Sequence, residues 1–208
     1  MSWFEDARKL TEEHYLASDE PWKQSGFSGP FERWETLRKP IAECIDRSGS
    51  FLDIGCANGF LIECLLKWSS YPIQPFGLDI SELLVTLARI RVPTATFWRG
   101  NSYEWKAPHT FDFVRTELCY VQAENETAYL KHLLSSVVSP KGILLVANYA
   151  EDNVNNSRVF KGANNVPEIV PHLRSLGFVV ESWRDGFDKV KGRHTRVAII
   201  RQELNSCL

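Results

Sequence analysis

Two glycines follow a short apolar run at a spacing that suits contact with a ligand. Residues 51–54 form the run, which contains Asp53, and Gly55 and Gly59 lie in the turn of small residues behind it. Glycine lacks a Cβ, so this turn can bring bare backbone against a bound molecule. A following helix would point its free N–H groups into the same space. The pattern predicts a ligand site at a strand–turn–helix junction, although such junctions also occur in α/β folds without a ligand.

Further candidate ligand contacts follow the next two apolar runs. Asp79 comes about 20 residues after the glycine turn, and a carboxylate there suits hydrogen bonds from both hydroxyls of a ribose. Asn101 carries a donor and an acceptor, as recognition of an adenine edge requires. Ile80 could lie flat against the adenine ring. The alternative is that Asp79 is an acid at a helix N-terminus and Asn101 a turn residue.

Apolar runs alternate with helical patterns and predict the sheet that would position these residues. The expected strands are residues 51–54, 74–80, 95–98, 111–115, 143–147, 178–183 and 197–201. The expected helices are residues 3–19, 31–46, a segment after Gly59, 81–91, 124–138 and 167–176. Residues 140–142 are expected to form a turn, and residues 148–165 a surface loop near the strand ends.

This alternation predicts an α/β fold with a doubly wound, seven-stranded, mostly parallel sheet and helices on both faces. Ligands bind such sheets beyond the carboxyl ends of the strands. No helix fits between the last two strands, so the last strand should be antiparallel. The polar, helix-prone N-terminal segment predicts a helical lid.

Composition narrows the classes of function. The chain has 208 residues and a net charge of −2 with no basic face, so one domain is expected and a nucleic-acid partner is not. The five cysteines form no CxxC pair, which argues against a disulfide framework and a zinc site, and no metal is predicted. The N-terminal residues lack the basic region and apolar core of a signal peptide. No apolar run approaches the roughly 20 residues that span a bilayer. The expected location is therefore the cytoplasm.

Five motifs in order resemble those of the class I S-adenosylmethionine-dependent methyltransferases. They are Asp53-x-Gly55-x-x-x-Gly59, Gly77-Leu78-Asp79-Ile80-Ser81, Gly100-Asn101-Ser102, Phe111-Asp112-Phe113-Val114 and Pro140-x-Gly142-x-Leu144. The resemblance covers about residues 30–150, and the antiparallel final strand extends it to residue 201. It implies a Rossmann-like S-adenosylmethionine-binding domain over residues 31–204, preceded by an N-terminal helix and lid loop over residues 1–30.

The resemblance also implies the cofactor S-adenosylmethionine, its product S-adenosylhomocysteine, and a role for each motif. Asp79 would bind the ribose, Ile80 would stack on adenine, and Asn101 with Ser102 would read the adenine edge. The methionine part would lie against Asp53, Gly55, Cys56, Ala57, Asn58 and Gly59, and the sulfonium would be flanked by Thr116, Glu117 and Leu118.

Two features around this loop differ from a generic member of the family. Ala57 replaces the usual middle glycine, and because alanine is the smallest substitution, cofactor binding should survive. Asn58 stands where Thr or Ser is frequent.

The loop from Trp22 to Phe27 suits the closing loop of many members, with Trp22 as a cofactor contact. The alternative is that both rings only cap the core.

A nicotinamide dinucleotide enzyme would share this fold. It requires Gly-x-Gly-x-x-Gly, with a pyrophosphate at the helix N-terminus. Here the glycines are four residues apart. The Asp53 carboxylate would lie near the pyrophosphate without a favourable interaction, whereas it suits a cationic ligand. The methyltransferase interpretation is therefore preferred.

Methyl transfer from a sulfonium requires alignment of the acceptor, exclusion of water and, for O–H or N–H acceptors, removal of a proton. Glu117 and Tyr120 are the predicted catalytic residues, although Glu117 could equally cap the cofactor or form a salt bridge with Arg115, and the reaction need not use a base. His109 precedes the fourth strand and should lie at the opposite end of the sheet. No Asn/Asp-Pro-Pro-Tyr motif follows that strand, which with the near-neutral charge favours a small-molecule acceptor. Specificity is expected in residues 1–34 and 148–165.

Three alternatives stay open at this point. One is a non-catalytic domain of the same fold that binds the cofactor or a partner. The others are methyltransferases that act on protein or on tRNA. The oligomeric state is not indicated.

Overall fold

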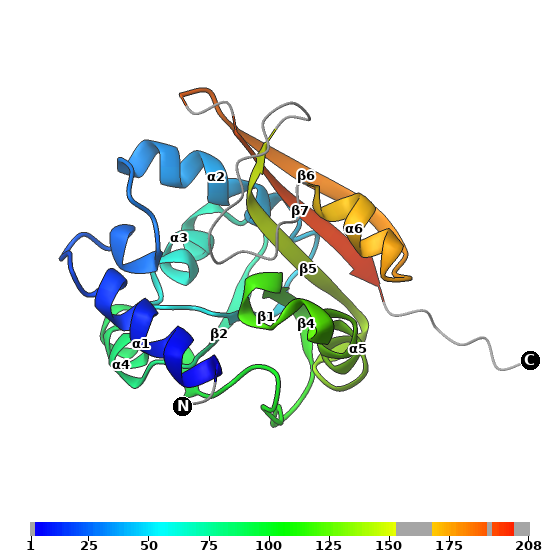
Figure 1. Ribbon diagram of the computed structural model, residues 1–208, viewed down its shortest axis with the longest axis horizontal. Coiled ribbons are helices and arrows are strands. Elements are labelled where there is room, and N and C mark those ends of the chain that lie inside the picture. The colour runs from blue at the N-terminus through cyan, green and yellow to red at the C-terminus, as the bar shows by residue number, and fades with distance from the viewer. Residues whose placement is uncertain (1–2, 153–167, 191–192, 202–208) are drawn as a thin grey trace, which may run out of the picture.

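The molecule is organised around one mixed sheet. A computed structural model describes residues 3–152, 168–190 and 193–201 of the chain. In these residues seven strands lie in the order β3-β2-β1-β4-β5-β7-β6 (Figure 1). Strands β3, β2, β1, β4 and β5 run parallel to one another, whereas β7 is antiparallel to both β5 and β6. The doubly wound sheet with an antiparallel last strand is therefore confirmed.

The helices and strands follow the predicted order. The strands are β1 Gly49–Ile54, β2 Ile73–Asp79, β3 Thr96–Arg99, β4 Phe111–Thr116, β5 Val138–Asp152, β6 Val180–Asp188 and β7 Arg193–Arg201. The helices are α1 Trp3–Tyr15, α2 Phe31–Glu43, α3 Phe60–Trp68, α4 Glu82–Arg91, α5 Glu126–Ser136 and α6 Ile169–Ser175. Short 3₁₀ turns are η1 Lys23–Ser25, η2 Leu118–Tyr120 and η3 Ala123–Asn125.

Local sequence signals explain where several helices begin and end. Pro30 directly precedes α2, where its fixed φ suits the first turn and its missing N–H costs nothing. Ser81 caps α4, its Oγ accepting a hydrogen bond from the backbone N–H of Leu84 at 3.2 Å. Gly177, which follows α6, has a φ of +87° that favours glycine.

Strand β5 is the main departure from the predicted elements. Residues 140–142 lie inside it and not in a separate turn, at a shift in its register with β4. Residues 148–152, expected in a loop, also belong to β5, because pairing with β7 continues to Asp152 and Arg193. The remaining part of the expected loop, residues 153–165, lies outside the described residues.

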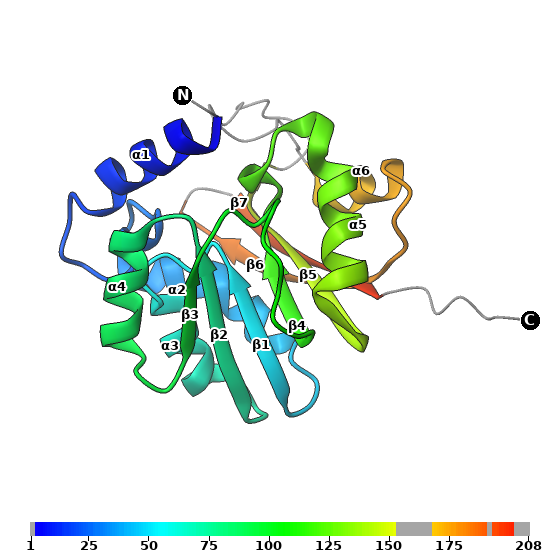
Figure 2. The same ribbon diagram turned by 90° about the horizontal axis from the view of Figure 1, so that it is seen from below.

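Helices cover both faces of the sheet (Figure 2). Helices α2, α3 and α4 pack on one face and α5 and α6 on the other. Because side chains alternate along a strand, Phe51 and Phe113 enter the core under α2 and α3, whereas Leu52 and Val114 enter the core under α5. Helix α1 crosses above the carboxyl ends of the strands, where the lid was expected.

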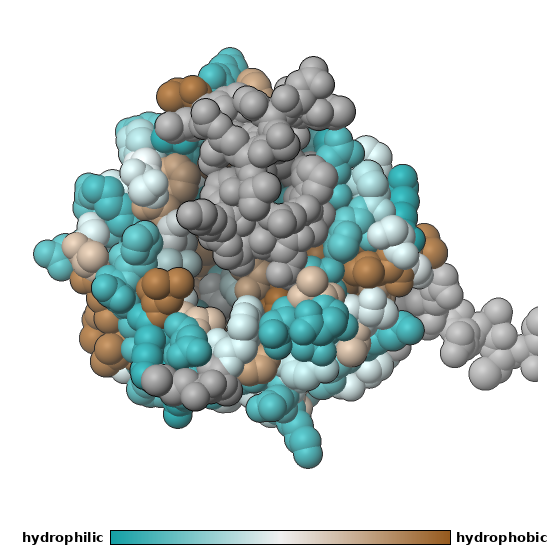
Figure 3. All heavy atoms as spheres, in the orientation of Figure 1, coloured by the Kyte–Doolittle hydropathy of each residue, from teal (hydrophilic) through white to brown (hydrophobic). Residues whose placement is uncertain are grey.

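On the face seen in Figure 3, the apolar residues that are visible lie in separate groups among polar ones. Within the described residues, none of the helices combines the length and hydropathy that crossing a membrane requires.

Helix α2 lacks one backbone hydrogen bond at the position where strand β6 approaches it. Pro40 lies inside α2 and has no N–H to donate to the carbonyl of Thr36, four residues earlier. Gly186 of β6 lies against this carbonyl, and a Cβ added there would be 2.5 Å from the Thr36 oxygen. The close approach of β6 to α2 therefore requires a residue without a side chain.

We expect Gly186→Ala to lower the free energy of unfolding by about 1–3 kcal/mol, because the backbone of Thr36 cannot yield as a side chain would. Urea unfolding of the purified variant measures this change. Arg184→Ala, on an exposed position of the same strand, is the control and should stay within about 0.5 kcal/mol of the wild type. Equal stabilities of the two variants would contradict the packing argument.

Candidate functional site

A cavity of about 480 Å³ lies between helix α1 and the carboxyl ends of β1, β2 and β3. Its volume is in the range of small-molecule sites. The predicted residues that line it are Gly55, Asp79, Ile80, Asn101, Ser102 and Tyr120. The structure therefore brings together the residues expected to contact ribose and adenine, although they come from separate loops.

Helix α1 supplies the apolar wall of this cavity. Its lining residues, which we did not predict as contacts, are Trp3, Phe4, Asp6, Ala7, Leu10, Thr11 and Tyr15. The helix is anchored at Glu12, whose Oε1 accepts a hydrogen bond from Ser81 Oγ at 2.7 Å. Leu10 and Tyr15 were the available sequence signal, because they are apolar positions on an otherwise polar helix.

Asp79 holds the glycine turn against the start of α4. Its Oδ2 accepts from the backbone N–H of Ala57 at 2.8 Å, and its Oδ1 accepts from that of Ser81 at 2.9 Å. Burial raises the pKa of Asp79, and these N–H groups oppose the rise. A carboxylate oxygen has room for a second hydrogen bond, so both oxygens remain able to accept from a ligand.

Ala57 explains why this turn usually carries glycine. Its φ of +46° lies in the left-handed region, which disfavours residues with a Cβ. The hydrogen bond to Asp79 holds it there. Thus the turn keeps the shape that presents its backbone to the cavity.

A second, smaller cavity of about 40 Å³ adjoins the first, since Tyr15, Gly55 and Tyr120 line both. Arg115 lines this cavity and is 3% exposed. The parallel register places Asp53 of β1 beside Arg115 of β4, and Arg115 Nη1 donates to Asp53 Oδ1 at 3.0 Å. The two charges thus neutralise each other at the carboxyl ends of adjacent strands.

Arg115 also positions three further groups. Its Nη2 pairs with Glu117 and donates to the Tyr149 hydroxyl at 2.7 Å, and its Nη1 donates to the Tyr120 hydroxyl at 3.2 Å. Arg115 was expected only as a possible salt-bridge partner of Glu117, whereas Tyr149 follows the expected strand 143–147 and so belongs to the strand ends where ligand contacts were expected. A charged side chain directly after Phe113 and Val114 was the sequence signal for Arg115.

Glu117 and Tyr120, the predicted catalytic residues, are in direct contact. The Tyr120 hydroxyl donates to Glu117 Oε1 at 2.9 Å. Burial raises the pKa of Tyr120 well above its ordinary value, so this hydroxyl keeps its proton. Of the two, Glu117 is therefore the group that can accept a proton from a substrate.

The Tyr120 ring lies directly over the glycine turn. A Cβ at Gly55 would lie 2.2 Å from the Tyr120 ring, and the φ of Gly55 is +73°. Only glycine at this position permits both the backbone conformation and the close packing of Tyr120.

Three buried polar atoms of residues that line this cavity lack a hydrogen-bond partner among the described residues. They are Asp53 Oδ2, Arg38 Nη1 and Arg115 Nε. Arg38 is 7% exposed, and its guanidinium lies 3.7 Å from the centre of the Tyr149 ring. Cation–π contacts of this kind contribute about 0.5–2 kcal/mol. A buried charge costs several kcal/mol unless it is paired, so the ring only partly offsets the burial.

Four of the remaining predicted contacts, Asn58, Gly59, Thr116 and Leu118, do not line either cavity. Asn58 ties the glycine turn to the N-terminal loop, its Nδ2 donating to Pro21 O at 3.0 Å and Gln24 Oε1 at 2.9 Å. Thr116 Oγ1 hydrogen-bonds the Tyr129 hydroxyl at 2.6 Å. Leu118 is part of the core, and Gly59 lies against Ala88. Cys56 and Ala57 do line the smaller cavity.

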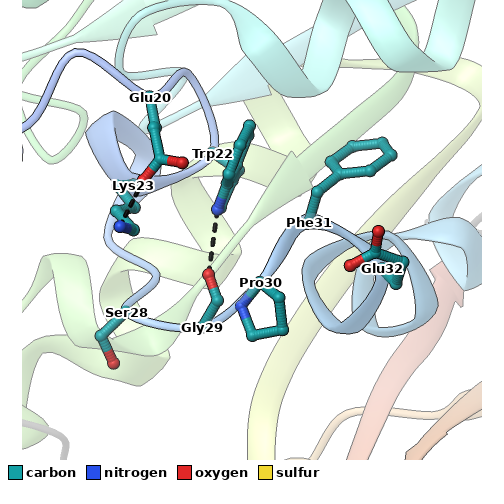
Figure 4. A pocket seen from close by; sticks show the side chains of 8 residues that line it. All are labelled: Glu20, Trp22, Lys23, Ser28, Gly29, Pro30, Phe31 and Glu32. Carbon is teal, nitrogen blue, oxygen red and sulfur yellow. Dashed lines mark hydrogen bonds and ion pairs between the residues drawn. The ribbon is translucent and has the colours of Figure 1, made fainter.

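Trp22 lines a separate hollow with Pro30 and Phe31 (Figure 4). Its Nε1 donates to the carbonyl of Gly29 at 2.9 Å, which closes the loop onto itself. Phe27 packs against the core under α2. In this arrangement the two rings follow the core-capping alternative, and the cofactor contact of Trp22 stays a prediction.

Two other expectations concern residues away from the cavities. His109 precedes β4 and packs against the rings of Phe76 and Phe111, at the amino end of the sheet as expected. Within the described ranges, no three His, Cys, Asp or Glu side chains are grouped as metal ligands.

Asp53 and Glu117 both pair with Arg115, and this sharing predicts that Asp53 makes the stability of the protein depend on pH. Burial raises the pKa of Asp53 from 3.8 to about 6, because Arg115 offsets only part of the desolvation. The folded protein therefore holds this proton more tightly than the unfolded chain. The resulting stabilisation is present below about pH 4 and is lost as the pH rises through about 6.

Urea unfolding of wild type and Asp53→Asn between pH 4 and 7 measures this effect. The stability of the variant relative to wild type should rise with pH. Asp112→Asn is the control, because hydrogen bonds from Ser50 and Ser139 lower the pKa of Asp112. The difference in stability between this variant and wild type should therefore stay constant over pH 5–7. A constant difference for Asp53→Asn as well would contradict the assignment.

Comparisons with known proteins agree with this arrangement of loops around the strand ends. Residues 51–142 match a family model described as a methyltransferase domain. The chain is 29% identical over 117 residues to a trans-aconitate 2-methyltransferase of Rhodopseudomonas palustris. That match covers 55% of this chain and 44% of the relative, so it spans less than half of the relative's length.

Solved structures share the fold at low identity. The 1,6-didemethyltoxoflavin-N1-methyltransferase of Burkholderia thailandensis, with its substrate and S-adenosylhomocysteine bound, has a TM-score of 0.67 and 16% identity. That match covers 97% of this chain and 91% of the other. The [4+2]-cyclase SpnF has a TM-score of 0.65 and 16% identity, over 85% and 83% of the two chains.

The topology, the glycine turn with its following acid, and the family match lead to one conclusion. This chain has the class I, Rossmann-like fold that S-adenosylmethionine-dependent methyltransferases share, and its residues 51–142 match the model of a methyltransferase domain.

Proposed function

We propose that this protein binds S-adenosylmethionine and transfers its methyl group to the oxygen or nitrogen of a small molecule. The observation that carries the proposal is the cavity beneath α1, where Asp79, Ile80 and Asn101 meet the glycine turn. A ribose acceptor, an apolar surface for adenine and an amide for its edge thus lie in one space of sufficient volume.

The residues present fit this cofactor. Asp79 would accept hydrogen bonds from the ribose hydroxyls, and Asn101 and Ser102 would contact the adenine edge. The free Oδ2 of Asp53 would meet the cationic methionine part, with Gly55 allowing close approach of the backbone. Helix α1, within the lid segment of residues 1–30, would cover the nucleoside and exclude water.

The chain's own residues can then serve the reaction in three ways. The bound cofactor supplies a methyl group already activated by its sulfonium, so alignment of the acceptor is the main requirement. Glu117 would accept the proton of an O–H or N–H acceptor. Arg115 and Tyr120 would hold Glu117 in place through the contacts described above.

The acceptor is proposed to be a small molecule. The matched relatives include enzymes named for trans-aconitate and 1,6-didemethyltoxoflavin, both small molecules. The near-neutral net charge of −2 offers no broad basic surface for tRNA. A second candidate function is a domain of this fold that binds the cofactor without methyl transfer, because one of the similar structures is named as a cyclase.

Binding of S-adenosylhomocysteine tests the cofactor site. We expect saturable binding by the wild type and at least about tenfold weaker binding by Asp79→Ala, because hydrogen bonds to a charged group contribute about 1.5–3 kcal/mol. Isothermal titration calorimetry measures both affinities. Asp112→Ala is the matched control, since Asp112 also accepts backbone hydrogen bonds but lies at the amino end of β4.

Wild-type affinity in Asp112→Ala with loss in Asp79→Ala supports the proposal. Failure of the folded wild type to bind either S-adenosylmethionine or S-adenosylhomocysteine would refute it. Methyl release over a panel of small acceptors then separates an enzyme from a cofactor-binding domain.

Replacing Glu117 by Gln tests its role in proton removal. We expect kcat to fall by about 10²-fold or more, with S-adenosylhomocysteine affinity within about twofold of wild type. Radiolabelled methyl transfer to an acceptor found in the panel gives kcat. Glu124→Gln removes an exposed carboxylate nearby and should leave kcat unchanged. An unchanged kcat in Glu117→Gln would show that this residue only orients Arg115.

A further inference from the structure

Asn58 is a buried amide that links the glycine turn to two other segments. It is 0% exposed. Its Nδ2 donates to the carbonyl of Pro21 at 3.0 Å and to Gln24 Oε1 at 2.9 Å. Its Oδ1 accepts from the backbone N–H of Phe60 at 3.2 Å, at the start of α3. One side chain thus joins the turn, α3 and the N-terminal loop (residues 16–30, between α1 and α2).

The bonds at position 58 require two donors and an acceptor on one short side chain. An amide supplies them, whereas a hydroxyl has one donor and a carboxylate has none. A threonine there would keep an oxygen for the N–H at the start of α3, as hydroxyl groups do at helix starts. With a single donor it could not serve both partners in the N-terminal loop. The link to this loop is therefore what the amide provides and a hydroxyl cannot.

The N-terminal loop in turn positions the end of helix α1. Tyr15, the last residue of α1, packs so closely on Gly26 of the loop that no room is left for a Cβ there. Ser25 Oγ accepts from Trp34 Nε1 at 2.9 Å, which attaches the same loop to α2. Tyr15 lines both cavities. The place of α1 over the cavities therefore depends on where the loop is held.

Helix α1 has little packing of its own to keep it there. None of its residues is buried. Glu12 attaches it to Ser81 through a single hydrogen bond of 2.7 Å, and its end at Tyr15 rests on the N-terminal loop. Segments with few buried apolar contacts open locally at a low cost in free energy. The hydrogen bonds of Asn58 therefore lie where they can control how often α1 leaves the cavity.

We propose that Asn58 is a positioning residue that fastens the N-terminal loop to the glycine turn and thereby keeps α1 closed over a bound ligand. Gly55 of the turn and Tyr15 of α1 line the same cavity, so a ligand there contacts both. It has the contacts with α1 only while the loop is fastened, and this difference favours the closed form. The inference deepens the proposed function and rests on it for the identity of the ligand, S-adenosylmethionine.

Trypsin cleavage after Lys23 of the full chain measures the fastening without any ligand. Lys23 lies between the two residues that Asn58 holds, so cleavage requires the loop to open. We expect cleavage there to be about fivefold or more faster in Asn58→Thr than in wild type, because hydrogen bonds to the loop are lost. Cleavage after Lys131, on exposed α5 surface, should not change and so separates local opening from global unfolding.

Two further variants complete this measurement. Asn125→Thr is the matched control, because Asn125 also precedes a helix but its side chain makes no cap hydrogen bond. It should be cut after Lys23 at the wild-type rate. Gln24→Ala removes one partner from the loop and leaves the glycine turn intact, so it tests the link even if Asn58→Thr does not fold. It should be cut about twofold or more faster than wild type.

The dissociation rate of S-adenosylhomocysteine, measured by stopped-flow fluorescence, tests the effect on the ligand. We expect it to rise about fivefold or more in Asn58→Thr, with a smaller change in the association rate, because opening of α1 releases the ligand. In the double variant Asn58→Thr/Gln24→Ala the two effects should not add, since each substitution removes the same bond. A role of Asn58 in folding alone would change the melting temperature and leave the dissociation rate unchanged.

The inference is overturned if folded Asn58→Thr and Gln24→Ala are cut after Lys23 at the wild-type rate. It is also overturned if cleavage is faster but S-adenosylhomocysteine dissociates as from wild type. Failure of the proposed function gives a different result, namely a folded wild type that binds no S-adenosylhomocysteine. In that case the cleavage rates still decide whether Asn58 fastens the loop.

Discussion

The buried ion pair between Asp53 and Arg115 is the interaction on which the site depends. It joins the carboxyl ends of the two central strands, where both side chains are buried, and Glu117 forms a second ion pair with the same guanidinium. Removing one partner of such a pair costs about 3–5 kcal/mol, because the other charge is left buried and uncompensated. The same guanidinium holds Glu117, Tyr120 and Tyr149, so strand pairing and the arrangement of the reactive side chains are set by one residue.

A second set of contacts joins the nucleoside cavity to the lid helix. Asp79 ties the glycine turn to the N-terminus of α4, and the cap of α4, Ser81, is hydrogen-bonded to Glu12 of α1. Movement of α1 would therefore disturb the same segment that places Asp79. This coupling gives α1 a physical link to ligand binding, beyond its role as an apolar cover.

The smaller cavity is unusual in its balance of charge. Two acids and two arginines line it, yet only Arg115 is paired with acids, while Arg38 is stacked on aromatic rings. Among the described residues, one acidic oxygen and one nitrogen of each guanidinium lack a hydrogen-bond partner. A site with both kinds of free group favours ligands that carry charge themselves, which separates it from the apolar cavity beneath α1.

Local patterns in the sequence were sufficient for the order of the elements, the strand–turn–helix at Gly55 and the cap at Ser81, because apolar spacing and capping act over a few residues. They also placed Asp79, Ile80 and Asn101 at one edge, since the carboxyl ends of parallel strands lie together. The length of β5 and the position of Trp22 were not accessible in this way. Both depend on which strand or loop becomes the neighbour.

The sequence by itself determined the doubly wound sheet and the residues that follow each strand. Only the tertiary structure decided that Arg115 pairs with Asp53, that Arg38 faces the same cavity, and that α1 covers Asp79. The reason is physical. Each of these contacts joins residues far apart in the chain, and its energy comes from burial and charge pairing that exist only once the strands and helices have packed.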